Sequence, residues 1–156
     1  MTGQGSIVVG VDGSEVGRAA LRWAVDEADR RGCGVDVVMA WHRDPGMVIG
    51  ALPAGFASVW SAEGARAEQE QILDATVRQV LGGNEAVPVR QALIAGDPRA
   101  VLTEASCGAD VLVLGSHGAN RVAQTLLGSV SAYCVRHATC PVVLIPDQRT
   151  ADSASR

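Results

Sequence analysis

The sequence contains no lysine, because all 13 basic residues are arginine. This absence excludes the lysine-containing phosphate loop, Schiff-base catalysis and a lysine general base. The chain also lacks an apolar stretch of the ~20 residues that a membrane-spanning helix needs. Its first ten residues, MTGQGSIVVG, lack the basic and long apolar segments of a secretory signal. The sequence therefore predicts a cytoplasmic protein with no membrane partner.

An excess of positive charge is absent as well. The formal net charge is −4, the isoelectric point is near 5.3, and 19% of the residues are charged. Such a chain has no overall field that would attract nucleic acid or anionic lipid. We expect no nucleic-acid partner.

The four cysteines form no zinc-site pattern. Cys33, Cys107, Cys134 and Cys140 include no C-x-x-C, and the spacing of the last two suits no common zinc site. In a reducing compartment, small buried residues are the expected role for such cysteines.

Short apolar runs alternate with longer amphipathic segments along the chain, which is typical of an α/β fold. Strands are predicted at residues 6–11, 35–41, 87–95, 110–114 and 142–145, and helices at 15–31, 61–81, 98–107 and 128–137. This pattern predicts one Rossmann-like domain at residues 6–146, a doubly wound five-stranded parallel sheet of order 3-2-1-4-5 with four helices. We expect residues 1–5 to form a flexible N-terminus and residues 147–156 a polar, disordered tail.

Residues 42–60 form an unusually long connection that mixes prolines and glycines with apolar residues. Two interpretations stay open for it, a lid or binding loop and a merely mobile insertion.

The strongest local signal lies in GSHGANRVAQTLLGSVS, residues 115–131. Gly115, Gly118, Gly128 and Ser129 give the spacing G-x2-G-x9-G-S, directly after a buried strand and at the start of a helix. Glycine lets the backbone approach a ligand closely and tolerates positive φ, and a helix N-terminus favours anions. The alternative is a glycine-rich turn with an ordinary serine cap. The combination favours phosphate binding, with the Ser129 hydroxyl donating to a phosphate or helping to hold a metal.

Asp12 follows the first predicted strand, where a carboxylate can accept hydrogen bonds from ribose hydroxyls. An Asx-turn residue before the helix is the competing interpretation. In doubly wound folds the ligand lies beyond the carboxyl ends of the strands, where both Asp12 and the glycine loop are expected.

Other chemistries find little support. The first strand–helix turn reads GVDGSEVG rather than G-x-G-x-x-G, and neither G-x-S-x-G nor H-E-x-x-H occurs. His117 and Arg121 could act on a phosphate or simply face solvent. His42 ends the second predicted strand, and His137 is expected to cap carbonyl groups of the last helix. We assign no catalytic residue and no protein metal ligand.

From residue 6 to 146 the chain resembles the universal stress protein family, in its ATP-binding subclass. Three blocks carry the resemblance: IVVGVDGSEVGRAALRWA, AGDPRAVLTEASCGADVLVLGSHG and LLGSVSAYCVRHATCPVVLIP. The resemblance implies that Asp12 contacts ribose, that Ala40 offers backbone groups to adenine, and that Gly115 lies near the ribose and α-phosphate. It further implies that Gly118, Gly128 and Ser129 hold the triphosphate with Mg²⁺ or Mn²⁺, and that Val130 packs nearby.

The resemblance also implies a homodimer that pairs the fifth strands, Val142, Val143, Leu144 and Ile145; a short apolar edge strand agrees with this. The expected function is a regulatory stress-response module in which ATP occupancy is sensed by an unidentified partner, with at most slow ATPase activity. Three alternatives stay open: a nucleotide hydrolase or adenylyl-transferring enzyme, a cAMP sensor, and a structural dimer that binds no nucleotide.

Overall fold

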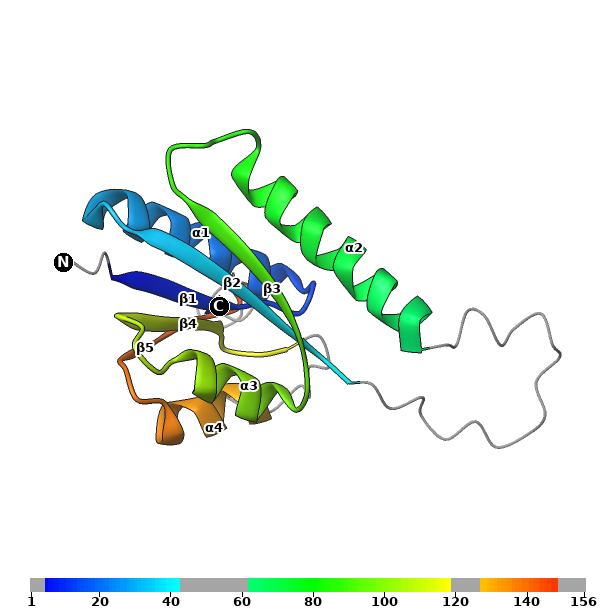
Figure 1. Cartoon of the computed structure of the whole chain (residues 1–156). Helices are drawn as coiled ribbons and strands as arrows, with labels where there is room; N and C mark the ends of the chain where they lie inside the picture. Colours follow the sequence, from blue (N-terminus) through cyan, green and yellow to red (C-terminus); the bar gives the residue numbers. More distant parts are fainter. Residues whose placement is uncertain (1–4, 43–61, 119–126, 149–156) are drawn as a thin grey trace, which may run out of the picture.

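The computed structural model describes residues 5–42, 62–118 and 127–148. Within them, strands and helices alternate as the sequence predicts (Figure 1). The strands are β1 (Ser6–Gly10), β2 (Gly34–Trp41), β3 (Val89–Ala95), β4 (Val111–Gly115) and β5 (Val142–Ile145), and the helices are α1 (Glu15–Arg31), α2 (Ala62–Leu81), α3 (Pro98–Ala105) and α4 (Ser129–His137).

All strand pairs are parallel, and the order is β3-β2-β1-β4-β5. This confirms the predicted doubly wound sheet. The chain winds in one direction from β1 through β2 to β3 and then returns to place β4 on the other side of β1. The switch point therefore lies between β1 and β4, and its carboxyl side is the expected ligand site in such a fold.

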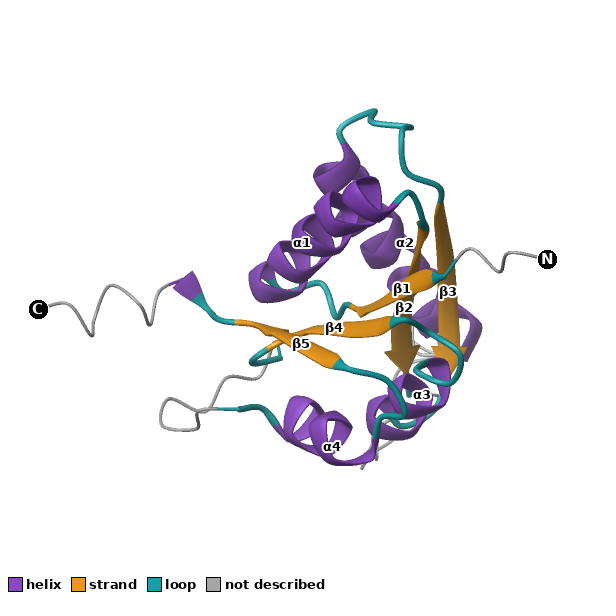
Figure 2. Ribbon diagram, turned by 90° about the vertical axis from the view of Figure 1, so that its left-hand side faces the viewer, coloured by secondary structure: helices purple, strands orange, loops and turns teal. Residues whose placement is uncertain are grey.

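Two helical layers enclose the sheet, as Figure 2 shows. Successive side chains of β1 alternate between the two faces: Ile7 and Val9 join the core under α1 and α2, whereas Val8 joins the core under α3 and α4. The central strands are apolar on both faces because each face is covered by helices.

Local residues mark the starts and ends of the helices. Ser14 caps α1 by accepting a hydrogen bond from the Gly17 N–H, and Gly32 ends that helix with φ +67°. Asp97 caps α3, and Pro98 occupies its first turn. Pro88 stands just before the edge strand β3, where its carbonyl accepts from the Val35 N–H.

The sequence predicts that the cysteines are small buried residues, and this prediction is wrong for Cys107. Cys33 and Cys134 are buried in the cores, but Cys140 is half-buried and Cys107 is exposed. Helix α3 ends at Ala105, two residues before its predicted end, and Cys107 lies in the turn that follows.

Three predictions lie largely outside the described residues: the 42–60 connection beyond His42, residues 119–126 of the glycine loop and most of the tail. Among the described helices, none has the length and apolar character needed to cross a membrane.

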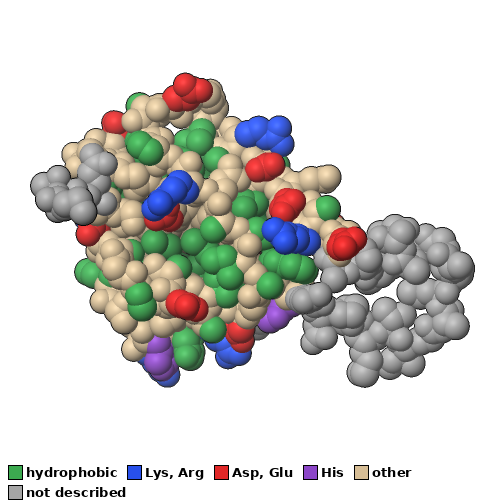
Figure 3. Space-filling view, in the orientation of Figure 1, with side chains coloured by type: hydrophobic (Ala, Val, Ile, Leu, Met, Phe, Trp, Pro, Cys, Tyr) green, Lys and Arg blue, Asp and Glu red, His purple; other side chains and the backbone are tan. Residues whose placement is uncertain are grey.

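On the face shown in Figure 3, acidic and basic side chains are interspersed around a group of hydrophobic ones. Ile94 of β3 is one of the exposed large hydrophobic residues of this structure.

Candidate functional site

A cavity of about 440 Å³ opens at the carboxyl ends of β1, β2 and β4 and at the start of α4. It lies at the switch point of the sheet. Its lining includes Asp12, Ala40, Gly115, Gly118, Gly128, Ser129 and Val130, the seven residues singled out from the sequence. The fold thus brings together residues that are up to 118 positions apart in the chain (130 − 12).

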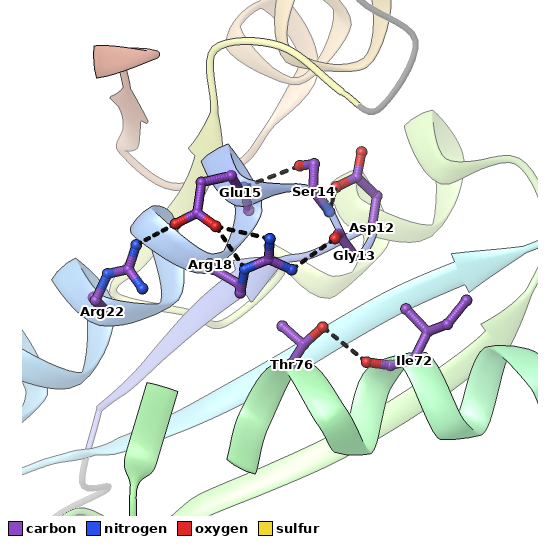
Figure 4. A network of polar contacts seen from close by, with 9 residues as sticks. Asp12, Gly13, Ser14, Glu15, Arg18, Arg22, Ile72 and Thr76 are labelled. Atoms are coloured by element: carbon purple, nitrogen blue, oxygen red, sulfur yellow. Dashed lines mark hydrogen bonds and ion pairs between the residues drawn. The ribbon is translucent and has the colours of Figure 1, made fainter. Parts of the chain in front are cut away.

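The turn after β1 holds Asp12 in place (Figure 4). The Ser14 N–H donates to Asp12 Oδ1 at 3.0 Å, which is the Asx turn that the sequence left open as an alternative. Asp12 Oδ2 lies on the side of the glycine loop, 3.2 Å from where a Cβ on Gly118 would stand. One carboxylate therefore closes a turn with one oxygen and faces the loop with the other.

The start of α4 forms the opposite wall. Its N-cap is Gly128, which provides no side-chain cap. The Ala132 N–H donates to the Gly128 carbonyl at 2.9 Å as the first bond of the helix. The N–H groups of residues 129–131 consequently precede the helical ladder, and such groups attract an anion together with the helix dipole.

Two short hydrogen bonds fix this helix start to the end of β4, and a third joins the end of β4 to β5. The Gly128 N–H donates to the Ser116 carbonyl at 2.7 Å, and the Ser131 hydroxyl donates to the Gly115 carbonyl at 2.7 Å. The Ser116 N–H in turn donates to the Ile145 carbonyl at 2.8 Å. Ser131 is only 4% exposed. The two ends of the glycine loop are therefore joined to each other and to the sheet.

The motif glycines serve close approach rather than unusual backbone angles. None of Gly115, Gly118 and Gly128 has positive φ, so the predicted tolerance of positive φ is not what these positions use. A Cβ on Gly115 would lie 2.6 Å from Val16 Cγ1, so this glycine lets α1 pack against β4. A Cβ on Gly128 would stand 3.4 Å from His117 Cα, against the backbone of the loop.

Comparison with known proteins gives the family. The family model described as "Universal stress protein family" matches residues 5–146. The chain belongs to the universal stress protein family. A universal stress protein of Mycobacterium tuberculosis is 32% identical over 144 residues, which cover 91% of this chain and 48% of the relative. The chain thus spans about half the length of the curated relatives it matches.

Solved structures share the fold. The universal stress protein UspA from Lactobacillus plantarum superposes with a TM-score of 0.72 at 22% identity, covering 91% of this chain and 97% of that one. A universal stress protein in complex with cAMP superposes with a TM-score of 0.57 at 23% sequence identity, covering 92% of this chain and 97% of that one. A universal stress protein family protein from Arabidopsis thaliana with AMP bound superposes with a TM-score of 0.57 at 21% sequence identity, covering 94% of each chain.

In this family member, charged side chains support the walls of the cavity. Glu15 bonds Arg22 and Arg18, and these hydrogen bonds lower the pKa of Glu15. Arg18 also donates to the Gly13 carbonyl at 2.9 Å and so braces the Asp12 turn (Figure 4). Of the arginines in the described ranges, none lines the cavity, and Arg121 falls outside them. Among the described residues, the groups at the cavity that can attract an anion therefore include the backbone N–H groups at the start of α4, together with its helix dipole.

The histidines separate into two groups. His42 and His117 both line the cavity. His137 does not: its Nδ1 lies 2.9 Å from the Tyr133 carbonyl oxygen in the last turn of α4, as expected for a C-terminal histidine.

Several lining residues escaped the sequence analysis: Gly10, Gly17, Pro98, Leu102, Leu114 and Ser131. Gly17 offered a usable signal, because a glycine near the start of a helix indicates close approach. A Cβ there would stand 3.2 Å from Asp12 Oδ1. Ser131 offered none, since one more serine in a helix does not reveal a buried tertiary hydrogen bond.

Within residues 5–42, 62–118 and 127–148, no cluster of three or more histidine, cysteine or acidic side chains could hold a metal ion. The oxygen ligands available at the cavity include the Asp12 carboxylate and the hydroxyl of Ser129. This set fits Mg²⁺ that arrives with phosphates, because that ion is commonly held by one or two protein groups, substrate phosphates and water.

Proposed function

We propose that this universal stress protein domain binds an adenine nucleotide, ATP in the first place, in the cavity at the switch point. One observation carries the proposal: the start of α4, whose N-cap Gly128 provides no side-chain cap, lines one cavity together with the described part of the glycine loop and the Asp12 carboxylate. Family members solved with cAMP and with AMP support the nucleotide class.

Each part of the nucleotide has a matching part of the cavity. Ala40, at the end of β2, offers backbone groups to the adenine, with Leu102 and Val130 as apolar neighbours. Asp12 accepts from ribose hydroxyls, and Gly115 lies near the ribose and α-phosphate. Gly118, Gly128 and Ser129 hold the phosphates, where the helix start compensates their charge.

Mg²⁺ or Mn²⁺ would accompany the triphosphate and screen its charge from Asp12. The Ser129 hydroxyl is the side chain placed to approach such a cation. Asp12 remains directed to the sugar, because a carboxylate next to unscreened phosphates would repel them.

We propose a regulatory role in a stress response rather than rapid turnover, with occupancy of the cavity sensed by a partner protein. Fast phosphoryl transfer needs a group that positions water and a cation that stabilises developing charge. His117 is the lining residue that supports the rival proposal of a hydrolase or adenylyl-transferring enzyme. Under that rival, His117→Ala abolishes turnover; under ours, any slow turnover is unchanged.

The domain is further proposed to form a homodimer through β5. This strand ends the sheet, pairs with β4 on one side, and keeps all four side chains half-buried. A short apolar edge strand of this kind is protected when it pairs with a second copy.

Calorimetric titration of nucleotide-stripped protein tests the proposal, with ATP and Mg²⁺, AMP and cAMP as separate ligands. We expect micromolar ATP binding that Gly118→Val weakens at least tenfold. The new side chain occupies cavity space and crowds Asp12 Oδ2, which lies 3.2 Å from the added Cβ and is its one neighbour within 4 Å among the described residues. Ala86→Val, at an exposed position far along the chain from these residues, is the matched control.

The outcomes separate the candidates. Equal ATP affinity in wild type and Gly118→Val would contradict the assignment of the loop. Binding of cAMP without ATP would make the protein a second-messenger sensor. The absence of binding for all three nucleotides would reduce the motif to a structural turn.

A further inference from the structure

Two cysteines occupy neighbouring connections at the end of the sheet opposite the cavity. Cys107 occupies the connection between α3 and β4, and Cys140 the connection between α4 and β5. Both connections lead into the amino ends of neighbouring strands. Cys107 is exposed and Cys140 half-buried, so neither is the inert core residue that Cys33 and Cys134 are.

The turn before β4 presents Cys107 at its corner. The Ala109 N–H donates to the Ser106 carbonyl at 3.2 Å, and Gly108 has φ +81°. Cys107 is thus the second residue of a tight four-residue turn. The position requires no strain from Cys107 itself, because Gly108 takes the left-handed conformation.

Strand register places Cys140 beside this turn. Leu112 is the partner of Val142 in the parallel pair, and the Leu112 N–H donates to the Pro141 carbonyl at 2.9 Å. Continuing that register by two residues sets Asp110 beside Cys140. Adjacent strands lie about 4.8 Å apart, so this register sets Cys140 about one strand spacing from Asp110, the residue that follows the turn containing Cys107. A disulfide requires the Cα atoms of its two cysteines to lie within about 7 Å.

Side-chain hydrogen bonds hold the two connections against each other. The Thr139 N–H donates to Ser106 Oγ at 3.1 Å, and Ser106 is fully buried. Cys107 follows Ser106 directly, and Cys140 follows Thr139. Burial raises the pKa of the Cys140 thiol, and Cys107 and Asp110 raise it further.

We propose that Cys107 and Cys140 form a reversible, oxidation-sensitive thiol pair. The exposed Cys107 thiol gives up its proton and its thiolate attacks a peroxide oxygen. The O–O bond breaks, a sulfenic acid forms on Cys107, and the departing hydroxide or alkoxide takes up the proton and leaves as water or an alcohol. The Cys140 thiol then attacks that sulfur, its proton leaves with the hydroxyl group as water, and a disulfide forms. A dithiol reductant restores both thiols. Transient disulfides of this kind occur in reducing compartments as redox sensors.

Mass spectrometry of the full chain tests the pair. Reduced protein is treated with equimolar hydrogen peroxide, unfolded, alkylated and digested. We expect an intact mass lower by two hydrogen atoms before alkylation, and two alkylated cysteines instead of the four in the sequence. A Cys107–Cys140 linked peptide should appear and disappear again with dithiothreitol.

Single variants provide the controls. Cys107→Ser, at an exposed position that tolerates the change, should abolish the intramolecular disulfide, as should Cys140→Ala. Cys134→Ala, at a buried site in the core, should leave the yield unchanged. Two results for peroxide-treated wild type would overturn the proposal. In the first, Cys140 remains free to be alkylated while Cys107 becomes a sulfinic acid. In the second, the disulfide links two chains instead of forming within one.

Discussion

Replacement of Gly115 by alanine should destabilise the fold through one contact between β4 and α1. The added Cβ would lie 2.6 Å from Val16 Cγ1 and 3.2 Å from the His117 carbonyl oxygen. Valine in a helix has one strongly preferred rotamer, so Val16 cannot easily turn away. Overpacking of this kind costs about 1–3 kcal/mol. In a chain of this length, each kcal/mol lowers Tm by roughly 2–4 °C.

Thermal unfolding of a double-mutant cycle isolates the contact. Val16→Ala removes both methyl groups of the neighbour, so Gly115→Ala should cost less than ~0.5 kcal/mol in that background. The resulting coupling energy should reach about 1 kcal/mol or more, within the range for residues in contact. Equal destabilisation by Gly115→Ala in both backgrounds would refute the reasoning, because it would show that Val16 is not the obstacle.

Three further changes test other parts of the molecule. Ser131→Ala removes a buried hydrogen bond to the Gly115 carbonyl and should lower the unfolding free energy by about 1–3 kcal/mol in a denaturant titration, whereas the exposed Ser129→Ala should change it by less than ~0.5 kcal/mol. The hydrogen bond from Arg99 lowers the pKa of Asp97 from 3.8 to about 2; ionised Asp97 therefore stabilises the fold above pH 3.8, and this contribution is lost as the pH falls toward 2. Asp97→Asn should show a smaller acid-induced drop in Tm over that interval, and equal drops would contradict the assignment. Val143→Asp should shift the proposed dimer toward monomer, measured by light scattering, more than Val143→Ala does. Both variants lose packing, but only aspartate places a charge at the sheet edge. A dimer that stays intact in Val143→Asp would contradict pairing through β5.

The fold could be predicted from sequence because its signals are local and agree with one another. Ser14 and Asp97 mark helix starts through their own side chains, and Gly32 marks a helix end. Continuous apolar runs predict strands covered on both faces. The errors are boundary shifts such as the end of α3. The Ser106 N–H still donates to the Leu102 carbonyl, but the Cys107 N–H donates to the Glu104 carbonyl and Gly108 takes φ +81°, which turns the chain out of the helix. A boundary of one or two residues of this kind is poorly fixed by local pattern.

The site was predictable where its residues form a spaced motif and not where they meet by packing. The spacing from Gly115 to Ser129 was recognisable, and the strand-end position of Asp12 followed from the sheet topology. The sequence leaves two alternatives for Asp12, an Asx turn and a ligand contact. In the structure Oδ1 accepts the hydrogen bond of the Asx turn, whereas Oδ2 faces the glycine loop at the cavity. Local reasoning treats a side chain as having one role, whereas a carboxylate has two oxygens that can differ.

The same bonds that stabilise this domain also prepare its cavity. The Ser131 hydroxyl and the Gly128 N–H tie the start of α4 to the carbonyl groups of Gly115 and Ser116, and the Ser116 N–H reaches Ile145 of β5. A ligand that binds the α4 start therefore meets donors that are already positioned, which reduces the ordering cost of binding. The chain of bonds also links the cavity to the strand proposed to pair with a second copy. A change at the loop that moves Ser116 must either break its bond to Ile145 or move β5, so nucleotide affinity and dimer stability should change together in Ser131→Ala.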